Sequence, residues 1–105
     1  AVASSSSRPA VVSRLEKAAL LPYFDAVISG DMIRRSKPEP DIFLLGCEKT
    51  GVTPEEAVVL EDSENGIRSA SRAGIATICV PDLKYPGEQV LPLIDVIVTA
   101  GEITE

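Results

Sequence analysis

The sequence predicts an α/β fold with a parallel sheet, and two observations carry this prediction. Five short apolar runs, rich in β-branched residues, recur along the 105 residues, and each is continuous rather than alternating with polar residues. Continuous runs are typical of strands buried on both faces, as in a parallel sheet. Helical patterns lie between them, and strand–helix alternation favours right-handed crossovers in a layered fold. The runs are Ala1–Ala3, Ala26–Ile28, Ala57–Leu60, Ala76–Val80 and Val96–Val98.

Three helices are expected between these strands. Pro9 suits the first turn of a helix, where its missing N–H group costs nothing, and apolar residues follow at helical spacing. Pro40 opens a second helical segment that Gly51 closes, and Asn65–Ala73 forms a third helix with Gly74 as its C-terminal cap. The third helix would present small residues to the sheet, namely Gly66, Ala70 and Ala73. The final segment, Thr99–Glu105, is expected to be a short helical turn.

Composition limits both the size and the partners of this chain. A length of 105 residues allows at most one domain, and a hydrophobic fraction of 45% supports a core. A net charge of −6 argues against nucleic acid or an anionic membrane surface as partner, and no apolar run is long enough to cross a bilayer. The opening AVASSSSRPA lacks the pattern of a signal peptide. The absence of histidine excludes histidine metal sites and histidine general bases.

The setting of the two cysteines indicates in which cellular compartment the protein resides. Cys47 and Cys79 lie in apolar surroundings. This setting predicts reduced core residues of a cytoplasmic protein, and a disulfide between them is the alternative.

Polar side chains follow the expected strands at the points where the strands end. Glu61 and Asp62 directly follow the run Ala57–Leu60, and the serines Ser4–Ser7 follow Ala1–Ala3. Ligands of parallel sheets bind beyond the carboxyl ends of the strands, so these side chains are expected to gather at one rim. Two adjacent carboxylates at a strand tip repel each other unless a positive charge lies close to them.

The chemistry of this rim suits a divalent cation and a phosphate. Mg²⁺ prefers carboxylate oxygens, retains several waters and clamps phosphoryl oxygens. The loop Ser4–Arg8 offers hydroxyls, backbone N–H groups and the N-terminus of a helix, which together make a phosphate seat. Lys37, restrained by Pro38 and Pro40, could offset negative charge beside a metal and a phosphate.

Each of these features also has a purely structural explanation. Glu61 and Asp62 could be a solvated strand end, with Asp62 or Ser63 capping the next helix. The serine run could be an ordinary loop and N-cap, and Lys37 could be a surface lysine. The residues alone leave these alternatives open.

Three stretches, SKPEPDIF, VVLEDSENGIRSASRAG and ATICVPD, stand in this order along the chain. Together they resemble the haloacid dehalogenase (HAD) superfamily, and within it the β-phosphoglucomutase-like phosphatases and phosphomutases. AVASSSSR resembles the second motif of that family, a strand ending in serine or threonine, and LPYFDAVISGDMI resembles the segment that follows. The resemblance covers nearly the whole chain. It implies a three-layer Rossmann-like (HAD-like) parallel sheet with flanking helices.

The resemblance also implies roles for individual residues. Ser4 would hydrogen-bond the transferring phosphoryl group, with Ser5 one residue away as an alternative. Lys37 would stabilise the aspartyl-phosphate and the charge of the nucleophile. Glu61 and Asp62 resemble the acidic pair of the metal site, where Asp62 would bind Mg²⁺ directly and Glu61 through water.

Substrate contacts are implied further along the serine loop. Ser6, Ser7 and Arg8 fall where some relatives grip a second phosphate or a sugar, and Arg8 could do so with its planar guanidinium. A surface role for Arg8 is the alternative.

The largest departure from the family pattern is an absence. The family begins with a strand ending in Asp-x-Asp, which supplies the nucleophile and the general acid/base, and no such strand precedes Ala1. Residues 1–105 are therefore expected to be the C-terminal portion of a HAD-like core domain, without the nucleophile strand and the cap domain. The missing strand would lie between Ala1–Ala3 and Ala57–Leu60, and its absence would leave a hydrophobic slot in the sheet.

The implied activity belongs to the intact protein. It would be a Mg²⁺-dependent phosphatase or phosphohexomutase that acts on a small phosphorylated sugar or similar metabolite through an aspartyl-phosphate, and this chain alone would be inactive. One alternative is an inert fragment or short protein that binds its missing half, another partner or a second copy through the slot. A non-catalytic binder of metal or phosphate is a further alternative. Substrate identity and the choice between phosphatase and mutase depend on the absent cap.

Overall fold

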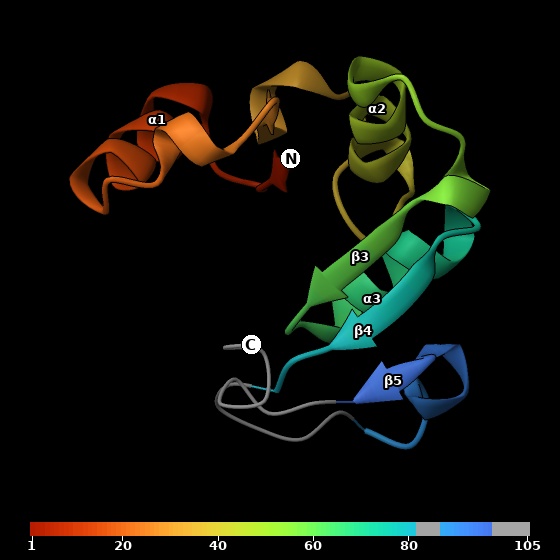
Figure 1. Cartoon of the computed structure of the whole chain (residues 1–105). Helices are drawn as coiled ribbons and strands as arrows, with labels where there is room; N and C mark the ends of the chain where they lie inside the picture. Colours follow the sequence, from red (N-terminus) through yellow and green to blue (C-terminus); the bar gives the residue numbers. More distant parts are fainter. Residues whose placement is uncertain (82–86, 98–105) are drawn as a thin grey trace.

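The computed structural model describes residues 1–81 and 87–97 and confirms an α/β fold (Figure 1). The helices and strands are β1 (Val2–Ala3), α1 (Arg8–Lys17), β2 (Val27–Ile28), α2 (Asp41–Thr50), β3 (Val58–Glu61), α3 (Glu64–Arg72), β4 (Ala76–Cys79) and β5 (Val96–Ile97). Every expected strand and helix is present within a residue or two of its predicted bounds. Val98 and the expected turn at Thr99–Glu105 lie outside the described residues.

The strands pair in parallel, as predicted, but they form two sheets. β1 pairs with β2, with Val2 opposite Val27. The second sheet has the order β3-β4-β5, and Val59 lies opposite Thr77 within it. Within the described residues the ladder is interrupted between β1 and β3. That is the position where the sequence predicts a missing strand.

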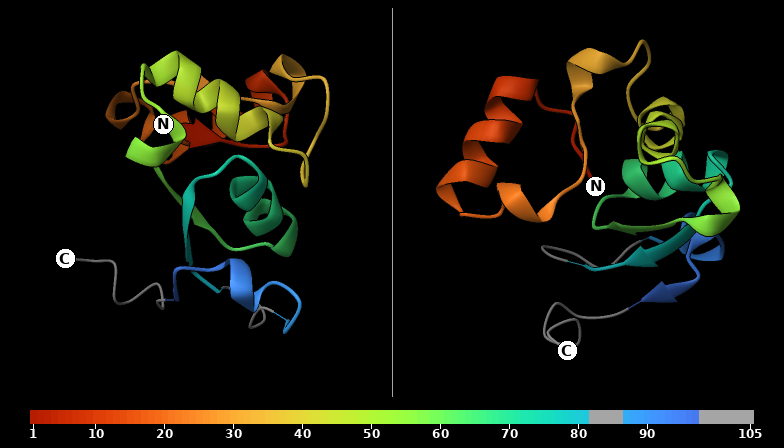
Figure 2. Two further views of the ribbon diagram at one scale, coloured as in Figure 1. Left: turned by 90° about the vertical axis from the view of Figure 1, so that its right-hand side faces the viewer. Right: turned by 45° about the horizontal axis from the view of Figure 1, so that its top comes forward.

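The helices cover these sheets in layers. In Figure 1 and in the right-hand view of Figure 2, α1 lies on one side of the β1–β2 sheet and α2 on the other. Helix α3 packs on β3 and β4 and also contacts α2. Among the described helices, none is long and apolar enough to span a membrane.

Local capping explains where the helices begin and end. Ser7 caps α1 by accepting the N–H of Ala10, and Ser63 caps α3 by accepting the N–H of Gly66. Gly51 follows α2 in the left-handed conformation, with a φ of 72°, which glycine adopts at no steric cost.

The larger core lies where α2 and α3 meet the strands. It includes Ile28, Ile42 and Phe43, and the small inner face predicted for α3 is buried as expected. Cys47 belongs to this core and Cys79 to a smaller cluster, and both are free thiols. They are therefore reduced, as the sequence predicts, and burial raises the pKa of each thiol.

One prediction from the apolar runs is wrong for β3. Val59 is buried, but Val58 and Leu60 are each 54% exposed, so this strand is covered on one face only. The reason is that successive side chains of a strand point to opposite faces, and helices pack on only one of them. Val58 and Leu60 line a cavity of about 690 Å³, together with Ala3 of β1 and Phe24. We call this cavity the slot, because it occupies the position predicted for the missing strand.

Candidate functional site

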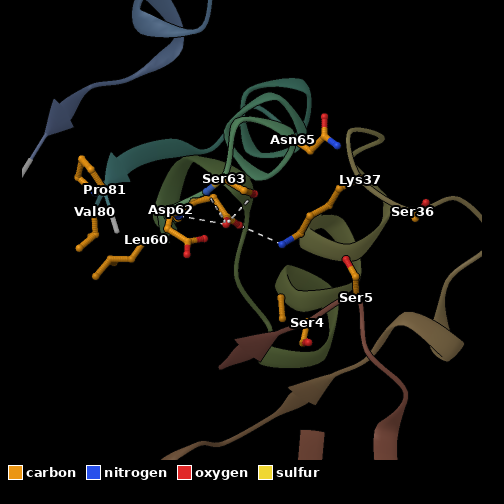
Figure 3. A pocket seen from close by; sticks show the side chains of 12 residues that line it. Ser4, Ser5, Ser36, Lys37, Leu60, Asp62, Ser63, Asn65, Val80 and Pro81 are labelled. Atoms are coloured by element: carbon orange, nitrogen blue, oxygen red, sulfur yellow. Dashed lines mark hydrogen bonds and ion pairs between the residues drawn. The ribbon is translucent and has the colours of Figure 1, made fainter. Parts of the chain in front are cut away.

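A second cavity, of about 930 Å³, lies at the carboxyl ends of β1 and β3. Its lining includes Ser4, Ser5, Lys37, Glu61, Asp62 and Ser63 (Figure 3). Three segments that are remote in sequence therefore meet at one rim: the serine loop, the lysine segment and the acidic end of β3. We refer to this cavity as the rim pocket.

Lys37 is fixed inside the rim pocket. Its Nζ lies 3.0 Å from Oε2 of Glu61, and the two side chains are only 13% and 10% exposed. The ammonium also lies 5.0 Å from the centre of the Phe43 ring, a distance at which a cation is attracted to an aromatic face. Lys37 is therefore not a surface lysine, and it supplies the positive charge that the acidic strand end needs.

Glu61 accepts hydrogen bonds at both of its carboxylate oxygens. Oε2 accepts from Lys37, while Oε1 accepts from the backbone N–H groups of Asp62 and Ser63 and from the Ser63 hydroxyl, at 3.1–3.3 Å. Burial alone would raise the pKa of Glu61, but the charge and hydrogen bonds of Lys37 and the N–H of Ser63 outweigh it. The net effect lowers the pKa below its ordinary value of 4.5. Glu61 is thus an ionised carboxylate already surrounded by donors.

Asp62 differs from Glu61 in its exposure. It lies on the surface and lines the rim pocket, beside Val80 and Pro81 (Figure 3). The alternative in which Asp62 caps α3 is wrong, because Ser63 holds that position. The two neighbouring carboxylates therefore differ in exposure: Glu61 is largely buried, and Asp62 lies on the surface.

The donor chemistry of the rim pocket fits part of a Mg²⁺ site. Carboxylate and hydroxyl oxygens are available from Asp62, Ser4 and Ser5. Within the described residues, no group of three or more His, Cys, Asp or Glu side chains is placed to hold a metal. The described residues therefore do not form a complete metal site by themselves.

The structure divides the serine loop into two parts. Ser4 and Ser5 both line the rim pocket; the Ser5 hydroxyl points toward the side of Lys37, whereas the Ser4 hydroxyl points away from it and accepts the N–H of Ser6 (Figure 3). The Ser6 hydroxyl instead accepts from the guanidinium of Arg14, at 3.3 Å. Ser6 and Arg8 are not among the lining residues, so only part of the predicted phosphate-binding set meets there.

The N-terminus of α1, which the sequence predicts as a phosphate seat, already has an anion beside it. The N–H of Arg8 donates to Oδ2 of Asp31, at 3.1 Å. The guanidinium of Arg8 donates to the carbonyl of Val27, also at 3.1 Å. Sequence reasoning missed Asp31 in this position, because contacts between residues 23 positions apart leave no local pattern.

A further contact missed from sequence supports the lysine segment. The fully buried hydroxyl of Ser69, on α3, donates to the carbonyl of Glu39 at 2.6 Å. Arg72, one turn along the same helix, forms an ion pair with the Glu39 carboxylate at 3.0 Å. Helix α3 therefore holds the segment that carries Lys37.

Comparison with known proteins identifies the family of this chain. Residues 1–80 match the family described as haloacid dehalogenase-like hydrolase. The chain belongs to the haloacid dehalogenase-like hydrolase family. A phosphorylated carbohydrates phosphatase of Thermotoga maritima is 41% identical over 78 residues, which cover 74% of this chain and 36% of that protein. Fructose-1-phosphate phosphatase YqaB of Escherichia coli is 39% identical over 80 residues, or 76% of this chain and 43% of that protein.

Solved structures of HAD proteins share the fold. A candidate β-phosphoglucomutase from Thermotoga maritima superposes with a TM-score of 0.81 and 33% identity, over 90% of this chain and 44% of that one. A CbbY variant from Rhodobacter sphaeroides was crystallised with xylulose-1,5-bisphosphate. It superposes with a TM-score of 0.67 and 38% identity, over 75% of this chain and 35% of that one. This HAD chain thus spans less than half the length of these relatives.

Proposed function

We propose that the intact protein is a Mg²⁺-dependent HAD phosphatase or phosphomutase that acts on a small phosphorylated sugar. The observation that carries the proposal is the rim pocket, a single cavity that Ser4, Ser5, Lys37 and Asp62 all line. The names of the relatives, which include a phosphorylated carbohydrates phosphatase and a fructose-1-phosphate phosphatase, support a sugar phosphate as substrate.

The catalytic contribution of this chain would be positioning and charge neutralisation. Phosphoryl transfer places negative charge on the transferring oxygens, and a fixed ammonium stabilises that charge without reorganising. Lys37 is held for this role by Glu61. The hydroxyl of Ser4, with that of Ser5 beside it, would donate to a phosphoryl oxygen.

For the metal, we propose Asp62 as the direct ligand. When bound, Mg²⁺ would neutralise charge on the phosphoryl oxygens. Because four donors already surround the Glu61 carboxylate, this residue would act on the metal only through water, and its main role would be to hold Lys37.

The nucleophile would come from outside this chain. We propose that residues 1–105 are the C-terminal portion of a HAD core, and that a strand carrying the nucleophilic aspartate pairs between β1 and β3. The interrupted ladder, the slot and the exposure of Val58 and Leu60 support this arrangement. Its carboxyl end would then open onto the rim pocket. A cytoplasmic location remains a prediction.

A second candidate function rests on the slot alone. A chain with an open, apolar-lined sheet edge can bind its missing half or another copy of itself without doing chemistry. Under this alternative the side chains of the rim pocket would have no catalytic role, and substitution of Asp62 would leave association through the slot unchanged.

Turnover in the intact protein separates these functions. We expect hydrolysis of p-nitrophenyl phosphate and of sugar monophosphates that EDTA abolishes and Mg²⁺ restores. Asp62→Asn should remove Mg²⁺-dependent turnover, whereas Glu55→Gln, at an exposed carboxylate outside the rim pocket, should not. Metal-independent turnover, or full activity of Asp62→Asn, would contradict the proposal. So would steady turnover by residues 1–105 alone.

A further inference from the structure

Asp31 lies at the junction between β2 and the serine loop, and both of its oxygens are engaged. Oδ1 accepts from the hydroxyl of Ser29 at 2.5 Å, and Oδ2 accepts from the N–H of Arg8 at 3.1 Å. Ser29 is fully buried, so one side of this arrangement is anchored in the core. The other side is the first residue of α1 and the last of the segment Ser4–Arg8.

Backbone contacts run parallel to this side-chain link. The N–H of Ser4 donates to the carbonyl of Ile28, and the N–H of Gly30 donates to the carbonyl of Ser6, at 2.9 and 2.8 Å. Gly30 also approaches the carbonyl of Ser5 so closely that a Cβ atom there would overlap it. The residues after β2 therefore support the loop along most of its length.

The charge of Asp31 suits its position. The hydrogen bond from Ser29, followed by that from the Arg8 N–H, lowers the pKa of Asp31, so this exposed carboxylate is ionised at neutral pH. A negative charge at a helix N-terminus is favourable, because unpaired N–H groups and the helix dipole both point there. The site thus has a fixed anion that orients the start of α1.

We propose that Asp31 is a positioning residue, which holds the segment Ser4–Arg8 against β2 so that Ser4 and Ser5 line the rim pocket. It does not line the pocket itself. The functional meaning of this inference rests on the proposed phosphoryl-transfer function. If Asp31 only capped α1, its loss would weaken folding without a specific effect on phosphate.

The first test measures inorganic phosphate binding to the intact protein by calorimetry. Asp31→Ala should weaken phosphate binding about tenfold, the scale of one well-placed hydrogen bond. Asp31→Asn should restore much of the loss, because its amide oxygen can still accept the N–H of Arg8. Glu16→Ala, which removes an exposed carboxylate from the other end of α1, serves as the control and should bind as the wild type does. Equal affinity of the wild type and Asp31→Ala would overturn the inference.

The second test asks whether the effect passes through the serine hydroxyls. Residues that act through one another give non-additive effects in a double-mutant cycle. In a Ser4→Ala/Ser5→Ala background, Asp31→Ala should therefore change phosphate affinity less than about twofold. A full tenfold effect in that background would show that Asp31 acts by another route, and the proposal would fail.

The third test separates this inference from the proposed function. Amide signals of Ser4–Arg8 in ¹⁵N-labelled intact protein report the loop directly. Asp31→Ala should shift these signals and speed their hydrogen exchange, while Glu16→Ala should not. If the wild type neither binds phosphate nor hydrolyses phosphate esters, the proposed function fails. The amide signals then decide the inference, and unchanged signals in Asp31→Ala overturn it.

Discussion

Lys37 and Glu61 form a largely buried ion pair, with 3.0 Å between Nζ and Oε2. The glutamate ends β3, and the lysine comes from a segment 24 residues earlier in the chain. Two buried charges of opposite sign depend on each other, because the removal of one leaves the other desolvated and unpaired. The pair is therefore a structural requirement as well as a candidate catalytic element.

The first prediction concerns the stability of this pair. Glu61→Gln and Lys37→Met should each lower the free energy of unfolding by about 3 kcal/mol, and the double variant should lose less than the sum. Urea unfolding of the wild type, the two single variants and the double variant gives the coupling free energy between Lys37 and Glu61. Arg35 and Asp41 form a more exposed pair at 2.9 Å, so Asp41→Asn should cost much less. Additive losses for Lys37 and Glu61 would show that the pair is not coupled.

The second prediction concerns pH. The lowered pKa of Glu61 means that the folded protein binds a proton on this residue less readily than the unfolded chain does. Its stabilisation is therefore fully present above the ordinary pKa of 4.5 and is lost as the pH falls through the lower folded value. Urea midpoints from about pH 6 to about pH 3 should fall less steeply in Glu61→Gln than in the wild type. Identical slopes would contradict the assignment.

The third prediction tests how closely α3 approaches the acidic strand end. A Cβ atom on Gly66 would overlap the carboxyl group of Glu61, so Gly66→Ala must displace Glu61 or the helix. We expect a lower melting temperature and weaker phosphate binding. Gly46→Ala is the matched control on α2, where the nearest contact is an ordinary 3.8 Å to Ile28. There the substitution should be neutral or stabilising, because alanine favours helices over glycine.

These cases show which parts of the site the sequence predicts. Glu61, Asp62 and the serine run were identifiable because they directly follow apolar runs, and the position of polar residues after a strand is a local signal. The pairing of Lys37 with Glu61, like the link from Asp31 to Arg8, joins distant segments and depends on tertiary structure. The same limit applies to β3, since a continuous apolar run does not reveal which of its faces a helix covers.

The fourth prediction concerns the support of the lysine segment by α3. Ser69→Ala removes the hydroxyl that donates to the Glu39 carbonyl, and the loss of such a hydrogen-bond partner costs about 1–3 kcal/mol. We expect reduced stability in urea and faster hydrogen exchange around Lys37. Ser71→Ala, on a half-buried serine of the same helix, is the control. Equal effects of the two substitutions would indicate a general loss of helix packing.

The last prediction concerns the slot. Val58 and Leu60 present apolar surface beside an interrupted sheet, and such edges promote association between chains. Residues 1–105 expressed alone should therefore self-associate with increasing concentration in sedimentation experiments. Val58→Thr with Leu60→Thr should reduce this association, because threonine has the β-branched shape that strands favour and replaces apolar surface with a hydroxyl.

A control on another exposed apolar residue makes this result specific. Tyr23 is 79% exposed and does not line the slot, so Tyr23→Ser should leave the association unchanged. Addition of the remaining part of the protein as a separate chain should then compete with self-association, since both would fill the same gap between β1 and β3. Association that resists both the threonine pair and this competitor would place the contact elsewhere, and the slot would lose its assigned role.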